Sequence, residues 1–229
     1  MNIQGFQKLT LLDFPEAVAC IVFTGGCNLR CPFCHNSGLV RSPLELPNAE
    51  AEVFEYLAGR RGILNGVCIS GGEPLLQGDL AAFAKRVKEM GYRVKLDTNG
   101  SLPKRLEEIL ATGLIDYVAM DIKSAPDTYS KATGSDMPFE LFEQSMSVLK
   151  KSGVAHEFRT TVVRGIHTQE DLIGIANIIG DERWFIQSFK DSGNVLCEGY
   201  SAFSYNELQE FLKVVKKSPR MSCFGDKNK

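Results

Sequence analysis

The chain has 229 residues, of which 44% are hydrophobic and 24% charged, which is ordinary for a globular protein with one sizeable core. Its net charge of −2 argues against a protein that binds nucleic acid or an anionic membrane through bulk positive charge. The first residues do not resemble a signal peptide, and no apolar stretch is long enough to span a bilayer. Seven cysteines, an odd number, do not form a paired framework, so we expect a protein of a reducing compartment, the cytoplasm.

Residues 1–17 are expected to form a lead-in segment with a short hairpin. After it, short apolar runs alternate with amphipathic helical patterns. The expected strands span residues 18–24, 66–70, 93–96, 116–120, 155–163 and 183–189, with a short terminal strand at 221–224. The expected helices carry apolar faces at residues 53–57, 80–90, 106–110, 139–149, 172–179 and 208–215.

Several helix starts carry local signals. Asn48 is an expected N-cap, and Pro103 suits a first helical position. Thr168 with Asp171, and Ser204 with Glu207, have the spacing of capping boxes.

Six strand-then-helix units predict a parallel sheet with right-handed helical crossovers. A full eight-unit barrel needs about 250 residues, so we expect a partial, open (β/α)6 barrel resembling a TIM barrel. A doubly wound open sheet is the alternative. We expect one domain over residues 1–229, with the lead-in at 1–17, the barrel core at 18–190 and a C-terminal extension at 191–229.

Three cysteines, Cys27, Cys31 and Cys34, lie close together after the first predicted core strand. Thiolates are the usual ligands of iron–sulfur clusters, and three of them on a loop leave one iron of a four-iron cube open. A zinc site would need a fourth ligand, and His35 is poorly placed because it directly follows Cys34. A disulfide does not suit a reducing compartment.

Polar motifs also follow the next three predicted strands: Gly71-Gly72-Glu73-Pro74, Asp97-Thr98-Asn99-Gly100 and Asp121-Ile122-Lys123. The C-terminal ends of parallel barrel strands share one face, where active sites are built. We therefore expect these motifs to converge with the cysteines. Alternative interpretations stay open: the glycines also suit a plain turn, the aspartates also suit turn caps, and Lys123 also suits a surface position.

The cysteine spacing, with aromatic Phe33 before the third cysteine, resembles the signature of the radical S-adenosylmethionine (SAM) superfamily. The resemblance implies a [4Fe–4S] cluster on the three cysteines, with SAM bound at the open iron through its amino and carboxylate groups. It implies that Gly71, Gly72 and Glu73 cradle the methionyl amino group. Phe33, Asp97, Thr98, Asp121 and Lys123 complete the expected SAM-binding set, with Lys123 reaching the ribose or carboxylate.

Four segments are similar to glycyl-radical-enzyme activases: Asp13-Phe14-Pro15, residues 23–28, Cys34-His35-Asn36 and Asp121-Ile122-Lys123. The resemblance covers residues 5–190 and is greatest to activases of anaerobic ribonucleoside-triphosphate reductase, with pyruvate formate-lyase activases as near neighbours. One departure is Glu16, where the family often has glycine. That departure affects the lead-in turn and leaves the chemistry untouched.

The resemblance implies that SAM is cleaved to methionine and a 5′-deoxyadenosyl radical, which abstracts hydrogen from a glycine of a partner enzyme. It also implies a flavodoxin-like or other one-electron reductant. In activases close to pyruvate formate-lyase activase, residues matching Asp97, Thr98 and Asp121 hold a monovalent cation beside SAM. The alternatives are a radical SAM enzyme for a small molecule, of the carboxy-deazaguanine synthase type, and a metal-binding protein without catalysis.

The remaining cysteines and histidines carry weaker signals. Cys20 and Cys68 lie within predicted strands and are expected to be core thiols. Cys197 and Cys223 lack the short paired spacing of a second cluster, and their roles stay open. His156 and His167 are expected to be structural or surface residues.

Overall fold

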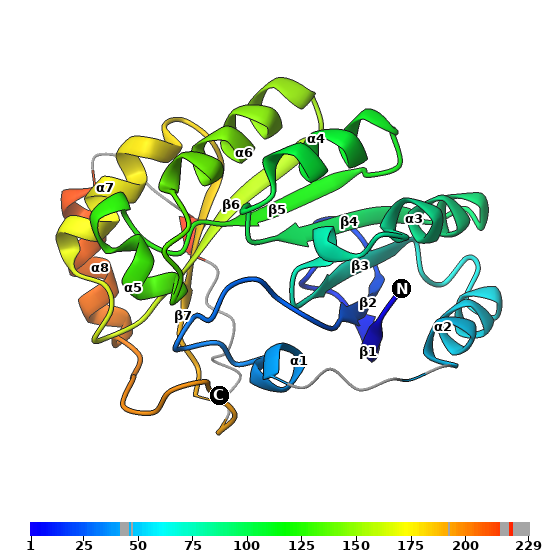
Figure 1. Cartoon of the computed structure of the whole chain (residues 1–229), viewed down its shortest axis with the longest axis horizontal. Helices are drawn as coiled ribbons and strands as arrows, with labels where there is room; N and C mark the ends of the chain where they lie inside the picture. Colours follow the sequence, from blue (N-terminus) through cyan, green and yellow to red (C-terminus); the bar gives the residue numbers. More distant parts are fainter. Residues whose placement is uncertain (42–45, 47, 192, 216–219, 222–229) are drawn as a thin grey trace. The chain divides into compact units, whose positions relative to one another are not determined.

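Figure 1 shows the computed structural model of the chain, which describes residues 1–41, 46, 48–191, 193–215 and 220–221. Its described strands form one sheet in chain order. The strands are β1 (Ile3–Thr10), β2 (Ala19–Thr24), β3 (Gly66–Gly71), β4 (Arg93–Thr98), β5 (Tyr117–Asp121), β6 (Ala155–Val162), β7 (Trp184–Ser188) and β8 (Arg220–Met221).

The sheet is mostly parallel and open, which confirms the predicted partial (β/α) barrel rather than the doubly wound alternative. β2 pairs in parallel with β3, β3 with β4, β6 with β7 and β7 with β8. β1 is the exception because it pairs antiparallel with β2. The lead-in therefore contributes a full edge strand where only a short hairpin was expected. Of the expected terminal strand, residues 222–224 lie outside the described residues.

Helices follow the strands as predicted, with two short additions, α1 (Ser37–Arg41) and α5 (Tyr129–Thr133). The others are α2 (Ala49–Ala58), α3 (Leu80–Glu89), α4 (Pro103–Ala111), α6 (Phe139–Ser152), α7 (Gln169–Ile179) and α8 (Tyr205–Val214). Both predicted capping boxes are present, at Thr168 and Ser204. Asn48 occupies the N-cap of α2 but its side chain makes no capping hydrogen bond. No described helix combines the length and apolarity needed to cross a membrane.

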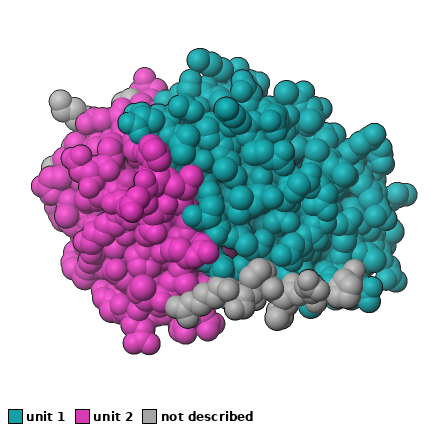
Figure 2. All heavy atoms as spheres, in the orientation of Figure 1, with its two compact units in different colours: residues 1–28, 38–119, 140–156 teal, residues 29–37, 120–139, 157–229 magenta. Residues whose placement is uncertain are grey.

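The chain divides into two compact units, coloured teal and magenta in Figure 2. Unit 1 comprises residues 1–28, 38–119 and 140–156, and unit 2 comprises residues 29–37, 120–139 and 157–229. We propose that both units belong to the single radical SAM domain predicted over residues 1–229.

In unit 1, Phe14 of the lead-in segment is a core residue, only 1% exposed. Its ring packs 6.1 Å from that of Tyr117, and a Cβ on Gly66 would come within 2.7 Å of it. Glu16, which stands where the resemblance often has glycine, adopts a φ of 60°. This left-handed conformation costs a non-glycine residue about 1–2 kcal/mol, which explains why glycine suits the position better.

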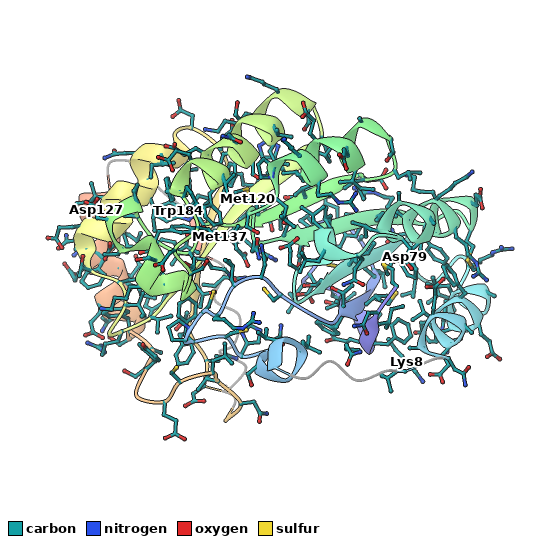
Figure 3. The ribbon with its side chains drawn as sticks, viewed as in Figure 1. Lys8, Asp79, Met120, Asp127, Met137 and Trp184 are labelled. Carbon is teal, nitrogen blue, oxygen red and sulfur yellow. The ribbon has the colours of Figure 1, made fainter. Side chains whose placement is uncertain are left out.

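In unit 2, the buried residues include Met120 and Trp184, both labelled in Figure 3. The Trp184 indole donates a hydrogen bond of 3.0 Å to the Thr160 hydroxyl, which in turn donates to the Ile122 carbonyl. This chain of bonds connects β7 and β6 to the segment directly after β5. It therefore fixes the backbone beside Asp121 and Lys123.

Candidate cofactor-binding site

The cysteine loop leaves β2 and is anchored by its backbone in unit 1. The Gly25 N–H donates to the Asn2 carbonyl at 2.9 Å, and the Gly26 N–H donates to the Leu39 carbonyl at 2.8 Å. Gly26 has a φ of 86°, a conformation that favours glycine. Cys27 belongs to unit 1, whereas Cys31 and Cys34 belong to unit 2.

Gly71 and Gly72 let the end of β3 press directly against this loop. The Gly72 N–H donates to the Thr24 carbonyl at 2.9 Å, and the Glu73 N–H donates to the Gly26 carbonyl at 2.8 Å. A Cβ on Gly71 would lie 2.4 Å from the Thr24 nitrogen, and one on Gly72 would lie 2.0 Å from the Gly26 oxygen. Both glycines therefore have a packing role, which is to bring two loop backbones into contact.

Gly72→Ala is expected to destabilise the protein by about 2 kcal/mol or more, because the new Cβ forces the cysteine loop away. Gly78→Ala is the matched control, since a Cβ there meets nothing within 4 Å, and its effect should stay within about 0.5 kcal/mol. Urea unfolding of both variants measures the difference. Equal stabilities would contradict the close backbone approach.

Glu73 is fully buried, and its carboxylate fixes the segment after β4. It accepts hydrogen bonds from the Leu75 N–H at 3.0 Å, the Thr98 hydroxyl at 2.9 Å and the Asn99 N–H at 2.7 Å. The ends of β3 and β4 are thereby joined through one carboxylate. This makes Glu73 a positioning residue for Thr98 and Asn99, while its predicted contact with SAM stays a prediction.

Asn99 connects that segment to the first cysteine. Its amide donates to the Cys27 sulfur at 3.7 Å and to the Asn28 side-chain oxygen at 3.1 Å. The Asn28 amide donates onward to the Ser101 hydroxyl at 2.8 Å. Asn99 was not predicted as a site residue, although it lies inside the motif that supplied Asp97 and Thr98. Hydrogen bonds to cluster sulfurs are one of the means by which proteins tune reduction potential.

Asp97 lies on the same strand as a buried lysine, which was not predicted as a site residue either. One carboxylate oxygen of Asp97 pairs with the Lys95 ammonium, and the other accepts the Ser70 hydroxyl at 3.0 Å. The Lys95 side chain is 0% exposed and also lies 3.9 Å from the Cys68 sulfur. The negative charge of Asp97 is therefore compensated from within unit 1.

Asp121 and Lys123 lie together in unit 2, with Arg159 of β6 as a third member. The Asp121 carboxylate contacts the Lys123 ammonium at 2.9 Å and the Arg159 guanidinium at 3.1 Å. Burial alone would raise the pKa of Asp121, but the charges of Lys123 and Arg159 outweigh it and hold that pKa well below its usual range. Arg159 had no sequence signal, because it arrives from a strand distant along the chain.

Asp121→Asn tests this arrangement through pH. A carboxyl whose folded-state pKa is depressed adds stability above its unfolded pKa, near 3.8, and loses it as pH falls toward the folded value. We expect the unfolding free energy of the wild type to fall more steeply below about pH 4 than that of Asp121→Asn. Urea unfolding between about pH 2 and 6 measures both curves, and parallel curves would contradict the ion pairs.

The second and third cysteines lie within the electrostatic reach of Lys123. Burial alone would lower the pKa of Lys123, but Asp121 and the Cys31 and Cys34 sulfurs together raise it above its usual range. Burial also lowers the pKa of His35, helped by the Lys123 and Arg159 charges and opposed by Asp121. His35 is thus held in its neutral form beside the cysteines.

Phe33 packs against a histidine with a structural role. The two rings lie edge to face, 6.2 Å apart. Nδ1 of His167 accepts the Val163 N–H at 3.0 Å, and Nε2 donates to the Lys123 carbonyl at 2.7 Å. Both nitrogens of His167 are therefore engaged, in agreement with its predicted structural role, and the residue fixes the backbone at Lys123.

Within each unit, the residues around the cysteines suit a thiolate-bound cluster. In unit 1 the Asn99 amide points at the Cys27 sulfur. In unit 2 the Lys123 charge lies near Cys31 and Cys34. A positive charge there offsets the negative charge that thiolate ligands bring. Within the described residues, no three His, Cys, Asp or Glu side chains are grouped as ligands of a single metal ion.

The residues expected to hold a monovalent cation are Asp97, Thr98 and Asp121. Asp97 is paired with Lys95, and Asp121 is paired with Lys123 and Arg159. The Thr98 hydroxyl donates to Glu73 and accepts the Gly100 N–H at 3.1 Å. Each expected ligand already has protein partners, and both carboxylates have cationic ones.

The other cysteines are not part of the loop that carries the three expected cluster ligands. Cys20 and Cys68 are 0% exposed, as predicted for core thiols, and burial raises the pKa of Cys20 to about 12. Cys197 is exposed and forms no disulfide with another described cysteine, and its backbone N–H donates to the Pro32 carbonyl at 2.8 Å. Cys223 lies outside the described residues.

The sequence is similar to a known protein family and to two glycyl-radical-enzyme activating enzymes. Residues 21–178 match the model of the "Radical SAM superfamily". The chain is 33% identical over 224 residues to "Putative glycyl-radical enzyme activating enzyme MJ1227" of Methanocaldococcus jannaschii, covering 94% of this chain and 92% of that protein. It is 31% identical over 192 residues to the pyruvate formate-lyase-activating enzyme of Clostridium pasteurianum, covering 80% and 77% of the two chains.

Two further matches are shorter or more distant. The chain is 36% identical over 143 residues to 7-carboxy-7-deazaguanine synthase of Methanopyrus kandleri, covering 54% of each chain. The structure of Streptococcus suis SuiB bound to precursor peptide SuiA aligns with a TM-score of 0.71 at 17% identity, covering 90% of this chain and 48% of that one. At that identity, the likeness to SuiB concerns the fold alone.

Proposed function

Because the chain belongs to the radical SAM superfamily, a family of enzymes that use a [4Fe–4S] cluster and SAM, we propose that it activates a glycyl radical enzyme. Anaerobic ribonucleoside-triphosphate reductase is the proposed partner. The observation that carries the activase role is the match to the Methanocaldococcus jannaschii protein, because it covers nearly the whole of both chains. The choice of partner rests on the sequence motifs.

In this proposal Cys27, Cys31 and Cys34 hold the cluster. Bound there, the cluster would provide the one-electron reduction that cleaves SAM to methionine and a 5′-deoxyadenosyl radical, and that radical would take a hydrogen atom from a glycine of the partner. A flavodoxin-like protein or another one-electron donor supplies that electron. Because the cluster thiols must stay reduced, we also infer a cytoplasmic location.

The chain's own residues position these groups. The backbone contact between Gly72 and the cysteine loop holds the segment proposed to receive the methionyl amino group. Asn99 orients the Cys27 sulfur through its amide, and Glu73 fixes Asn99 through its backbone N–H. Lys123 is proposed to contact the ribose or carboxylate of SAM. Its positive charge also interacts electrostatically with the Cys31 and Cys34 sulfurs.

The experiment is an anaerobic assay of the reconstituted holoenzyme with dithionite, SAM and anaerobic reductase. We expect 5′-deoxyadenosine together with a glycyl radical in the electron paramagnetic resonance spectrum. A reductase variant with alanine at the radical glycine should give no such radical. If a folded, reconstituted sample forms neither a cluster nor 5′-deoxyadenosine, both the proposed cluster site and the proposed SAM cleavage are wrong.

A second candidate is a radical SAM enzyme acting on a small molecule, which the similarity to the Methanopyrus kandleri synthase favours. SAM cleavage without a radical on the reductase would contradict the proposed partner. The assay would then be repeated with a pyruvate formate-lyase-like enzyme. If that enzyme also forms no radical, the result favours the small-molecule candidate.

A further inference from the structure

Asp97, which was expected to hold a free cation, is paired with Lys95. We propose that Lys95 is a built-in counter-charge, so that this chain binds SAM without K⁺ or Na⁺. The proposal rests on the SAM-binding part of the proposed function and is independent of which partner is activated. It makes Lys95 a positioning residue that acts through Asp97.

The placement of Lys95 follows from strand geometry. Residues two apart on a strand project to the same face, so Lys95 and Asp97 of β4 point the same way. Lys95 is the register partner of Cys68 on β3, and its ammonium lies 3.9 Å from the Cys68 sulfur. The lysine thus lies on the same face of β4 as Asp97, which is closer to the carboxyl end of the strand.

Because the Lys95 and Asp97 side chains are buried, each needs the opposite charge of the other. The Lys95 side chain is 0% exposed and that of Asp97 is 12% exposed, so solvent screens the two charges poorly. A buried charge must be paired, and the pair is costly to break from one side only. An alkali ion at this carboxylate would compete with the buried ammonium for the same negative charge.

The second carboxylate oxygen of Asp97 adds to the argument. It accepts the Ser70 hydroxyl at 3.0 Å, so the carboxylate is held from β3 as well as from β4. A lysine ammonium is a compact point charge, and in that respect it resembles an alkali ion. Lys95 can therefore supply both the charge and the fixed position that a bound cation would give to Asp97.

The test compares the wild-type holoenzyme with Lys95→Met. Each is titrated with KCl or NaCl against tetramethylammonium chloride at constant ionic strength, while the melting temperature and the SAM dissociation constant are measured anaerobically. For the wild type we expect both quantities to stay constant. For Lys95→Met we expect SAM to bind about tenfold more weakly in tetramethylammonium, with saturable recovery in K⁺ or Na⁺.

Two further variants make the result specific. Lys95→Met/Asp97→Asn removes both charges, so its SAM affinity should not respond to alkali ions. Lys88→Met is the matched control, because Lys88 pairs with Asp116 at 2.6 Å and Asp116 accepts the Val94 N–H near the start of β4. It removes a lysine–aspartate pair away from Asp97, so its SAM affinity should be independent of the cation.

A wild type whose melting temperature or SAM affinity rises saturably with K⁺ or Na⁺ would overturn the proposal, whether or not the variants fold. A folded Lys95→Met that ignores alkali ions would overturn it too. Failure of the wild type to bind SAM would count against the proposed function instead, and the melting-temperature titration would still decide the role of Lys95.

Discussion

Cys31→Ala is expected to abolish SAM cleavage, with a loss well beyond the roughly 10- to 100-fold that follows removal of an outer partner of a metal ligand. Three cysteines are the proposed protein ligands, so losing one leaves two thiolates for a four-iron cube. Cys31 is also 7% exposed, so no ligand from solvent can readily replace it. Iron and sulfide content, the spectrum of the reduced cluster and 5′-deoxyadenosine formation measure the loss.

Cys197→Ala is the matched control. Cys197 is exposed, and its contact with the cysteine loop runs through its backbone N–H, which alanine retains. We expect this variant to keep its cluster and its SAM cleavage. Full iron content in Cys31→Ala, or equal losses in both variants, would contradict the assignment of the ligands.

The positions of the strands were largely predictable because they depend on local pattern. The segments that became β2, β3 and β5 are runs of apolar residues, as expected of strands buried on both faces. β1 was missed as a full strand because its sequence, IQGFQKLT, mixes polar and apolar residues on an edge with exposed positions. Edge strands satisfy only one side of the hydrogen-bonding ladder and need no continuous apolar run.

The residues of the candidate site were predictable where they follow a strand, and not where they arrive from elsewhere. The motif at the end of β4 supplied Asp97 and Thr98, but the contact of Asn99 with Cys27 joins residues 72 positions apart. Arg159 reaches Asp121 from β6, which no local pattern indicates. Lys95 did carry a signal, since a lysine in the middle of a parallel strand breaks the expected apolar run.

Glu73→Ala is expected to lower both stability and SAM affinity. The substitution removes the acceptor of the Leu75 N–H, the Thr98 hydroxyl and the Asn99 N–H. An unsatisfied buried donor costs about 1–3 kcal/mol, so the unfolding free energy should fall by about 3 kcal/mol or more. SAM affinity should fall as well, because the segment after β4 loses its fixed position while the cysteines remain.

Two comparisons separate positioning by Glu73 from direct contact with SAM. Glu73→Gln keeps the shape and one oxygen acceptor, so it should fall between the wild type and Glu73→Ala in both measurements. Glu108→Ala removes an exposed carboxylate paired with Arg105 at 3.1 Å, and should change stability by less than about 0.5 kcal/mol. Urea unfolding gives the stabilities, and anaerobic calorimetry gives the SAM affinities. Weaker SAM binding at unchanged stability would mean that the carboxylate contacts SAM itself, and unchanged SAM affinity would exclude both roles.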